Sequence, residues 1–291
     1  MTFPVLIEFL LNGLVLGAIY VLMALGLSII FGMVGVINFA HGALFTLGAY
    51  VAYQLKDTLG FGGALVAAPL LVGLLGMLIE ATLLRRLYAE DPLQGLLLTF
   101  GLAMIIEQGI RIVWGLSPKS FAMPAAFAGA LQLGPVVYSR YRSFILLCVV
   151  LLIAGLVLFL EKTPIGTIVR AGSRDPTMVR LLGISLGPVL TLVFGLGVAL
   201  AAVAGVLAAP LAGVEPAMGV NVGVAAFVVV TIGGLGSFWG AVISGLLVGQ
   251  VVSLSIYFQP RVAEASMYVL MALILLARPR GLMGERWEKF E

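Results

Sequence analysis

The chain has 291 residues, of which 62% are hydrophobic and 10% are charged, and its formal net charge is +3. A soluble globular domain carries about 25% charged residues, so this composition excludes an ordinary soluble fold. It also excludes a nucleic-acid-binding protein, because the basic residues lie between apolar stretches rather than in one patch. The sequence predicts an all-α polytopic membrane protein that forms a single transmembrane domain over residues 1–291.

Apolar runs divide the chain into about eight expected spans joined by short connections. One long run, near 222–257, contains a glycine-rich break and is expected to cross inward and return in two short passes. No separate soluble domain or low-complexity linker is expected between the spans. The expected spans cover residues 5–31, 41–56, 62–84, 95–114, 143–160, 188–212, 222–257 and 264–278.

The first interruption of the apolar pattern lies at 31–42, between the first two spans. Asn38 and His41, the only histidine of the chain, stand there beside Gly42. In hydrocarbon every polar group needs a partner inside the protein, so this stretch must be buried in protein or line a water-filled pathway. We interpret Asn38, His41 and Gly42 as candidates for a substrate pathway. The alternative is that the two polar side chains form hydrogen bonds that hold helices together.

Two residues of opposite charge stand within the fourth expected span. Glu107 precedes Arg111 by four residues, which is the favourable order for an ion pair on one face of a helix. A charge within the membrane is by default a candidate functional group. Because the partner is only one turn away, we interpret Glu107 and Arg111 as a structural ion pair.

A polar loop near 161–187 follows the fifth expected span. Asp175 is a good N-cap, Pro176 suits the first helical position and Gly183 suits the residue after a helix end. These signals predict about two turns of helix with an apolar face. That face can pack on the membrane interface or under its own bundle, or it can enter a groove of a cytoplasmic partner. The candidate contact residues are Arg170, Asp175, Met178, Arg180, Leu182 and Gly183.

A second glycine-rich interruption lies at 231–240, in the second half of the chain. One broken segment in each half of a transporter is typical of internal repeats around a central pathway. The two breaks therefore suggest an internal repeat in which 31–42 and 231–240 are counterparts. We add Gly233, Gly234 and Ser237 to the candidate pathway residues.

Small residues recur at every fourth position in several spans. Gly13 with Gly17 and Gly245 with Gly249 are two such pairs. Small residues let helices approach closely in a membrane, where lipid gives no hydrophobic drive for association. We expect tight packing within the bundle, and a subunit interface is the alternative.

The basic residues of the connections indicate an orientation. Ten of them are expected on one side, namely Arg85, Arg86, Lys162, Arg170, Arg174, Arg180, Arg278, Arg280, Arg286 and Lys289. Five are expected on the other side, namely Lys56, Lys119, Arg140, Arg142 and Arg261. The positive-inside rule then places the N-terminus outside and the C-terminus in the cytoplasm.

The sequence offers few groups for catalysis or metal binding. With one histidine and one cysteine, Cys148, it lacks the ligands of a usual zinc site, so we expect no metal. No lysine follows a glycine, so the chain lacks the phosphate-binding loop that ATP hydrolysis uses. The few acidic groups within spans argue against an ion-coupled carrier and favour a separate motor. We expect a transport subunit without a cofactor, not an enzyme.

Four segments taken together resemble a known family. They are Ile37–Gly42, Arg170–Ser185, Gly233–Ser237 and Arg278–Leu282, in this order along the chain. They resemble the permeases of high-affinity branched-chain amino acid ABC importers, and the first segment resembles the first of the two permease subunits. The chain departs from the family pattern at Val179, where a small residue is expected, and at Trp239, where proline is common.

The resemblance implies several partners. They are a second, related permease subunit, two cytoplasmic ATPase subunits that bind ATP and Mg²⁺, and a periplasmic or other extracytoplasmic substrate-binding protein. It also implies that the helix at 175–183 couples the chain to an ATPase. Membrane lipids surround such a protein, which lies in the bacterial cytoplasmic (inner) membrane, and no nucleic acid is involved.

We therefore predict a permease subunit of an ATP-driven importer that translocates branched-chain or other apolar amino acids into the cytoplasm. The same architecture can import urea, short amides or other amino acids, because a fold does not define a substrate. A stand-alone channel or ion-coupled carrier is a hypothesis of another class. A membrane enzyme that acts on lipids would need clustered acid, base or metal ligands, which the sequence lacks.

Overall fold

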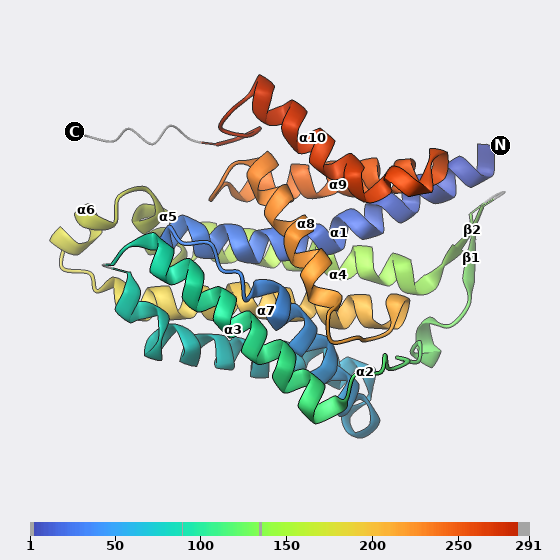
Figure 1. Cartoon of the computed structure of the whole chain (residues 1–291), viewed down its shortest axis with the longest axis horizontal. Helices are drawn as coiled ribbons and strands as arrows, with labels where there is room; N and C mark the ends of the chain where they lie inside the picture. Colours follow the sequence, from blue (N-terminus) through green and yellow to red (C-terminus); the bar gives the residue numbers. More distant parts are fainter. Residues whose placement is uncertain (1–2, 89, 134–135, 285–291) are drawn as a thin grey trace.

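The computed structural model describes residues 3–88, 90–133 and 136–284, so the tail residues Arg286 and Lys289 lie outside the described residues. The described chain is a bundle of helices with a two-stranded hairpin near one end (Figure 1). The helices are α1 Phe3–Val34, α2 His41–Thr82, α3 Pro92–Trp114, α4 Arg140–Lys162, α5 Pro164–Arg174, α6 Pro176–Leu181, α7 Leu186–Ala212, α8 Met218–Gly233, α9 Phe238–Phe258 and α10 Ala263–Ala277. The shorter elements are the 3-10 helices η1 Leu84–Leu87, η2 Ala125–Phe127 and η3 Pro260–Val262, and the strands β1 Ala130–Leu133 and β2 Val136–Ser139.

The long apolar runs form helices, as expected. Among the described residues, 7 helices are long and apolar enough to cross a membrane. One of them, α2 with η1, has 47 residues, or about 70 Å of helix against a hydrocarbon core of about 30 Å. Gly60 breaks it with a φ of 68°, and the chain turns back there (Figure 1). α2 therefore has two arms, residues 41–59 and 61–82, and the all-α polytopic class is confirmed.

Two connections hold more structure than the sequence predicted. The connection after α3 forms the β1–β2 hairpin, which the Tyr138 hydroxyl fastens to α1 by donating to the Leu11 carbonyl at 3.1 Å. The polar loop near 161–187 contains α5 as well as the predicted short helix, α6. α5 forms because Thr163 caps it, accepting from the Gly166 N–H at 3.0 Å, and a proline follows the cap.

The two halves of the bundle follow one plan with opposite direction. α1 runs from the end with the hairpin, the hairpin end, to the end with α6, the α6 end, whereas α7 runs the other way (Figure 1). A non-helical link follows each: the first link is residues 35–40 and the second link is residues 213–217. Both open on a glycine with positive φ, Gly35 at 73° and Gly213 at 78°. The first arm of α2 and α8 then begin midway along the bundle.

Packing between the halves follows the same plan. The most extensive contacts of α1 are with α9, and those of α7 are with α2. α2 and α8 cross at Gly42 and Gly219, where a Cβ on either glycine would overlap the carbonyl oxygen of the other. The arrangement is an inverted repeat of the kind that transporters use around a central site.

The repeat pairs different breaks from those that the sequence suggested. The counterpart of the first break is the second link, residues 213–217, rather than 231–240. The break at 234–237 separates α8 from α9, as Gly60 separates the arms of α2. Glycine content misled the pairing, because positive-φ glycines occur both in the links and at the reversals, at Gly35, Gly60, Gly213, Gly234 and Gly236.

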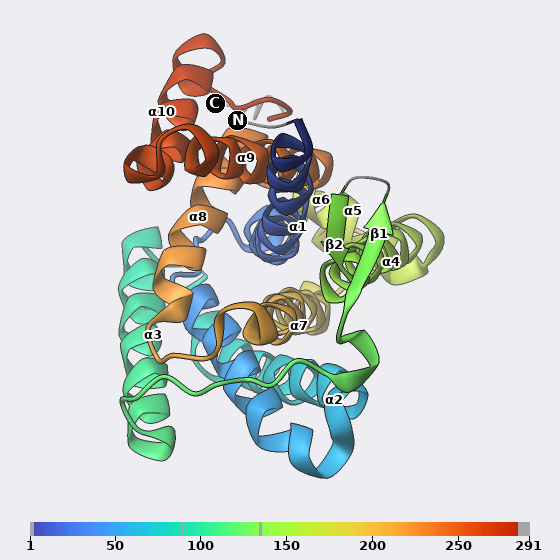
Figure 2. The same ribbon diagram turned by 90° about the vertical axis from the view of Figure 1, so that its right-hand side faces the viewer.

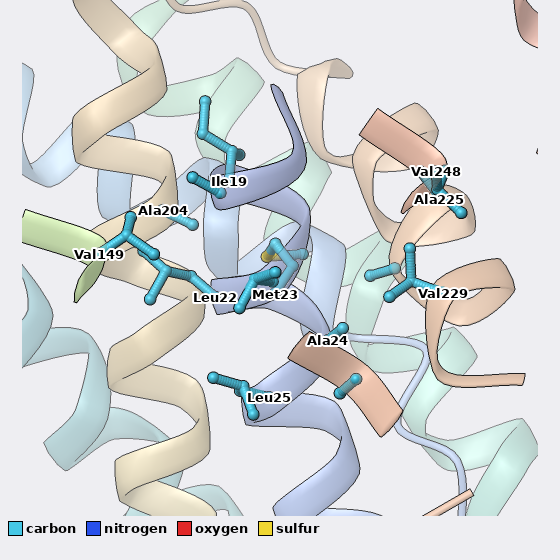
Figure 3. Close-up of a cluster of buried hydrophobic side chains, with 14 of the residues drawn as sticks. Ile19, Leu22, Met23, Ala24, Leu25, Val149, Ala204, Ala225, Val229 and Val248 are labelled. Atoms are coloured by element: carbon cyan, nitrogen blue, oxygen red, sulfur yellow. The ribbon is translucent and has the colours of Figure 1, made fainter. Parts of the chain in front are cut away.

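The apolar core surrounds α1. Seen along the bundle, α1 lies between α7, α8 and α9 (Figure 2). Figure 3 shows α1 side chains between residues of the neighbouring helices, including Leu22, Met23, Leu25, Val149, Ala204, Val229 and Val248. The predicted small-residue contact is present, because a Cβ on Gly17 would lie 3.0 Å from the Gly245 carbonyl oxygen. α1 is therefore tightly packed at the center of the bundle.

Candidate functional site

A cavity of about 630 Å³ lies between α3, α8 and the first arm of α2. Ligand pockets for small molecules fall in the range of about 300–1,000 Å³. Its walls are mainly apolar and include Leu27, Phe100, Met104, Val220, Val224 and Phe227. Figure 2 shows α3 standing beside α8 and α2. Its size and lining suit a small ligand with an apolar part.

Two helix N-termini meet at this cavity. The first turn of α2 lines it with His41, Gly42 and Ala43, and the first turn of α8 lines it with Gly219 and Val220. The first N–H groups of a helix lack intrahelical partners, and the helix dipole makes this end positive. The N-cap residues are alanines, which form no side-chain cap at either helix. The helix dipoles therefore favour a negative group where the two helices begin, while the carbonyls of Asn38, Glu215 and Ala217 already accept from the N–H groups of His41, Met218 and Val220.

Asn38 and His41 bring polar side chains to the same place. Asn38 is 4% exposed, and its Oδ1 accepts from the Ala40 N–H at 3.0 Å. His41 is 2% exposed, and its Nε2 donates to the Met23 carbonyl at 3.1 Å, because a carbonyl can only accept. Asn38 Nδ2 and His41 Nδ1 have no hydrogen-bond partner among the described residues. Buried polar atoms are rarely left unpaired, so these two atoms call for a partner, a ligand or an ordered water, that the described residues do not supply.

α3 holds the first link against the cavity. The Phe39 N–H donates to the Thr99 hydroxyl at 3.2 Å, and that hydroxyl lies 3.0 Å from the Leu96 carbonyl and 3.4 Å from the Ile37 carbonyl. Thr99 is buried, so this contact fixes the position of the first link, and with it Asn38, along α3. Thr99 therefore positions the first link.

Glu107 lines the cavity on the α3 side. Its Oε1 pairs with Nη2 of Arg111, one turn along the helix, so the expected ion pair is present. Arg111 does not line the cavity, and its Nε has no partner among the described residues. The pair therefore presents a negative group, rather than a positive one, to the cavity.

The structure separates the predicted pathway residues into two groups. Asn38, His41 and Gly42 line the cavity, whereas Gly233, Gly234 and Ser237 do not. The second group lies at the break between α8 and α9, where Ser237 Oγ caps α9 by accepting from the Gly240 N–H at 3.1 Å.

The glycines of this second group make room for the C-terminal segment. The Met283 N–H donates to the Gly233 carbonyl at 3.0 Å, and the Leu282 N–H donates to the Ile232 carbonyl at 2.8 Å. At Gly234, which has a φ of 100°, a Cβ would lie 2.6 Å from the Gly284 Cα. Close backbone contact therefore explains the glycines at this break.

Sequence reasoning missed part of the cavity. It did not place Glu107 there, and it did not single out the second link or the α8 residues Gly219 and Gly223. The spacing of four between Gly219 and Gly223 is a small-residue signal that was available. Pro216, three residues after Gly213, is a further sign of a helix break.

The α6 end of the bundle carries a separate surface. Asp175 Oδ1 accepts from the Met178 N–H at 2.8 Å, and Gly183 has a φ of 81°, so the predicted caps of the short helix are confirmed. Val179 packs inward against α7, while the neighbouring apolar residues point outward. We call the exposed set, Met178, Leu181 and Leu182, the α6 patch; these side chains are 54%, 77% and 72% exposed. The candidate residues Arg170 and Arg180 are also exposed.

A buried charge fastens α2 to α7 near this surface. Glu80 is fully buried and accepts from Arg85 Nη2 at 3.0 Å, from the Tyr88 hydroxyl at 3.2 Å and from the Thr191 hydroxyl at 2.6 Å. Burial, together with the charge of Glu80, raises the pKa of Tyr88, so this phenol stays a donor. The start of α7, which follows α6, is therefore firmly attached to the bundle.

Comparison with known proteins identifies relatives. The family described as branched-chain amino acid transport system / permease component matches residues 9–278. The chain is 31% identical to the high-affinity branched-chain amino acid transport system permease protein BraD of Pseudomonas aeruginosa, with 94% of each chain covered. It is 31% identical to the LivH permease protein of the same kind of system in Escherichia coli K12, again with 94% of each covered.

A second type of permease is more distant. The LivM permease protein of Escherichia coli K12 is 28% identical, over 91% of this chain and 68% of LivM. No solved structure matches. The family match over most of the chain and the identity to BraD and LivH show that this chain belongs to the branched-chain amino acid transport permease family, as a multi-pass membrane protein.

Proposed function

We propose that this chain is a transmembrane permease subunit of an ATP-driven importer, and that it passes branched-chain or other apolar amino acids into the cytoplasm. The observation that carries the proposal is the cavity of about 630 Å³ where two helix N-termini meet between apolar walls. Helices that begin inside the bundle and point their N-termini at a central site are typical of transporters with inverted repeats. The names of BraD and LivH support the substrate class.

The pathway residues in this proposal are Asn38, His41 and Gly42, which line the cavity. The residues near the break at 234–237 serve the C-terminal segment instead, so we leave Gly233, Gly234 and Ser237 out of the substrate path. Access alternates when the two halves rock about the cavity.

ATP hydrolysis takes place on other subunits in this proposal. The α6 patch is the contact to a cytoplasmic ATPase, because its leucines and methionine are exposed at one end of the bundle beside Arg170 and Arg180. Val179 transmits the contact inward, since it packs on Leu186 and Leu190 of α7. The α6 end is then cytoplasmic, with the N-terminus outside and the C-terminus inside, as the basic residues indicate.

The proposed assembly has two permeases. LivH and LivM are both permease proteins of high-affinity branched-chain amino acid systems, and this chain resembles both. We therefore expect a second, related permease beside this chain, two ATPases that bind ATP and Mg²⁺, and an extracytoplasmic binding protein that delivers substrate.

The test is uptake by the complete complex in liposomes, with ATP inside and the binding protein outside. Labelled leucine uptake is measured against unlabelled leucine, isoleucine, valine, phenylalanine, urea and acetamide. Competition by the branched-chain amino acids supports the proposal, whereas competition by urea or acetamide but not by leucine contradicts it. Liposomes that hold this chain alone are the control, because flux without an ATPase would make it a channel or carrier.

A further inference from the structure

We propose that the cavity recognises both charged ends of a free α-amino acid. Glu107 takes the ammonium group, and Asn38 Nδ2, with the N-termini of α2 and α8, takes the carboxylate. The inference rests on the proposed function and deepens it, because it names the chemical groups that a substrate must carry inside the membrane.

Glu107 is the anionic end of the site. Its Oε1 pairs with Arg111, but a carboxylate offers two oxygens and about four lone-pair positions, so it can accept from a second cation. Most of the other residues that line the cavity are apolar, among them Phe100, Met104 and Phe227. Apolar surroundings strengthen the attraction between opposite charges relative to water.

Asn38 and the two helix starts form the cationic end. Asn38 Nδ2 is a donor without a partner in the described chain, because Oδ1 already accepts from the Ala40 N–H. Gly42 and Gly219 stand in the first turns of α2 and α8, and both line the cavity. N–H groups at a helix start, together with the dipole, bind carboxylates. The buried Asn38 donor is independent of the helix ends and points to the same kind of ligand.

The remaining wall holds the side chain of the substrate. Leu27, Val220 and Val224 line this part of the cavity and offer no hydrogen bonds from their side chains. An apolar side chain gains by leaving water there, whereas a polar one would lose its hydrogen bonds. The site therefore suits a zwitterion with an apolar side chain. It does not suit urea or a short amide, which carry neither charge.

Direct binding tests this assignment. The complex of permeases and ATPases is purified without the binding protein, and equilibrium binding of labelled leucine is measured. The competitors are leucine, leucinamide, which lacks the carboxylate, and 4-methylpentanoate, which lacks the ammonium group. Each analogue leaves one end of the site unpaired, so we expect it to compete at least about tenfold more weakly than leucine. Equal competition by all three would overturn the assignment.

Variants assign each end. Glu107→Gln should weaken leucine binding at least about tenfold and leave 4-methylpentanoate binding nearly unchanged. Asn38→Ala should weaken leucine and 4-methylpentanoate but not leucinamide. Glu264→Gln on α10 and Asn221→Ala on α8 are matched controls, because neither residue lines the cavity.

A further variant separates recognition from the ion pair. Arg111→Gln removes the pair but keeps the Glu107 carboxylate, so it should retain leucine binding. If Arg111→Gln loses binding as strongly as Glu107→Gln, the pair is structural and the assignment is wrong. If Glu107→Gln and Asn38→Ala bind like the wild type while the wild-type complex imports leucine, the assignment fails and the proposed function stands. Absence of leucine uptake by the wild type would instead contradict the proposed function.

Discussion

The two links of the inverted repeat have the same backbone plan but different attachments. The first link, residues 35–40, is held by Thr99 of α3 and carries Asn38 to the cavity. The second link, residues 213–217, is held by two backbone hydrogen bonds between Val214 and Lys119, of 2.8 and 2.9 Å. Only the first link brings a buried side-chain donor without a partner in the described chain. The repeat therefore supplies the shape of the site, and its departures from symmetry supply the chemistry.

The links also differ in the neighbouring segments to which they connect. The first link follows Met33 and Val34, which pack in the same cluster as Val179 of α6. The second link lies by the segment that leads to the hairpin, through its bridge to Lys119. Packing therefore joins α6 to the residues just before the first link, whereas the second link is hydrogen-bonded near the opposite end of the bundle.

The crossing that both halves share should show the largest effect. Gly219→Val would place a side chain where even a Cβ overlaps the Gly42 carbonyl, so we expect loss of more than about 3 kcal/mol of stability or no assembly. The matched control is Gly109→Ala on α3, where a Cβ has no atom within 4 Å. Thermal unfolding followed by gel filtration measures both, and a stable Gly219→Val protein would contradict the close crossing.

Charged substitutions in the α6 patch test whether this patch is the contact to an ATPase. Leu181→Glu with Leu182→Glu changes only exposed side chains, so folding and leucine binding should persist while uptake falls at least about tenfold. Leu116→Glu, which changes an exposed residue near the other end of the bundle, is the control. Normal uptake by the double variant would exclude the ATPase contact.

Loosening each link separately sharpens the comparison. Thr99→Val leaves the Phe39 N–H without its acceptor, which costs about 1–3 kcal/mol and should weaken leucine binding. Lys119→Pro removes a donor to Val214 and should lower stability by a similar amount without a change in leucine binding. Binding isotherms for leucine and melting temperatures of the two variants show whether each link affects binding, stability or both. Equal effects on binding would show that the links are equivalent.

The smallest effect is expected at the break between α8 and α9. Ser237→Ala removes the cap of α9 and should cost about 1 kcal/mol of stability. Because Ser237 does not line the cavity, leucine binding should not change. A loss of leucine affinity in this variant would show that the break at 234–237 belongs to the substrate path.

Sequence reasoning located most of the fold and part of the site. The spans were predictable because long apolar runs must form helices in a membrane. Asn38, His41 and Gly42 were predictable as a group because they are adjacent in the chain. Glu107 and Gly219 reach the same cavity only through tertiary packing, since one lies on α3 and the other on α8. The pairing of the links was missed because glycine is also needed at the reversals of direction.

The crossing of α2 and α8 has a mechanical consequence. At Gly42, Gly219 and Gly223 the two helices touch mainly through backbone atoms, with the Thr46 hydroxyl beside Gly219 as the side chain in this contact. Elsewhere in a packed interior, sliding one helix over another forces side chains to change rotamer. At this crossing few side chains stand between the two helices, so we expect that a tilt of one half of the molecule against the other would require few rotamer changes.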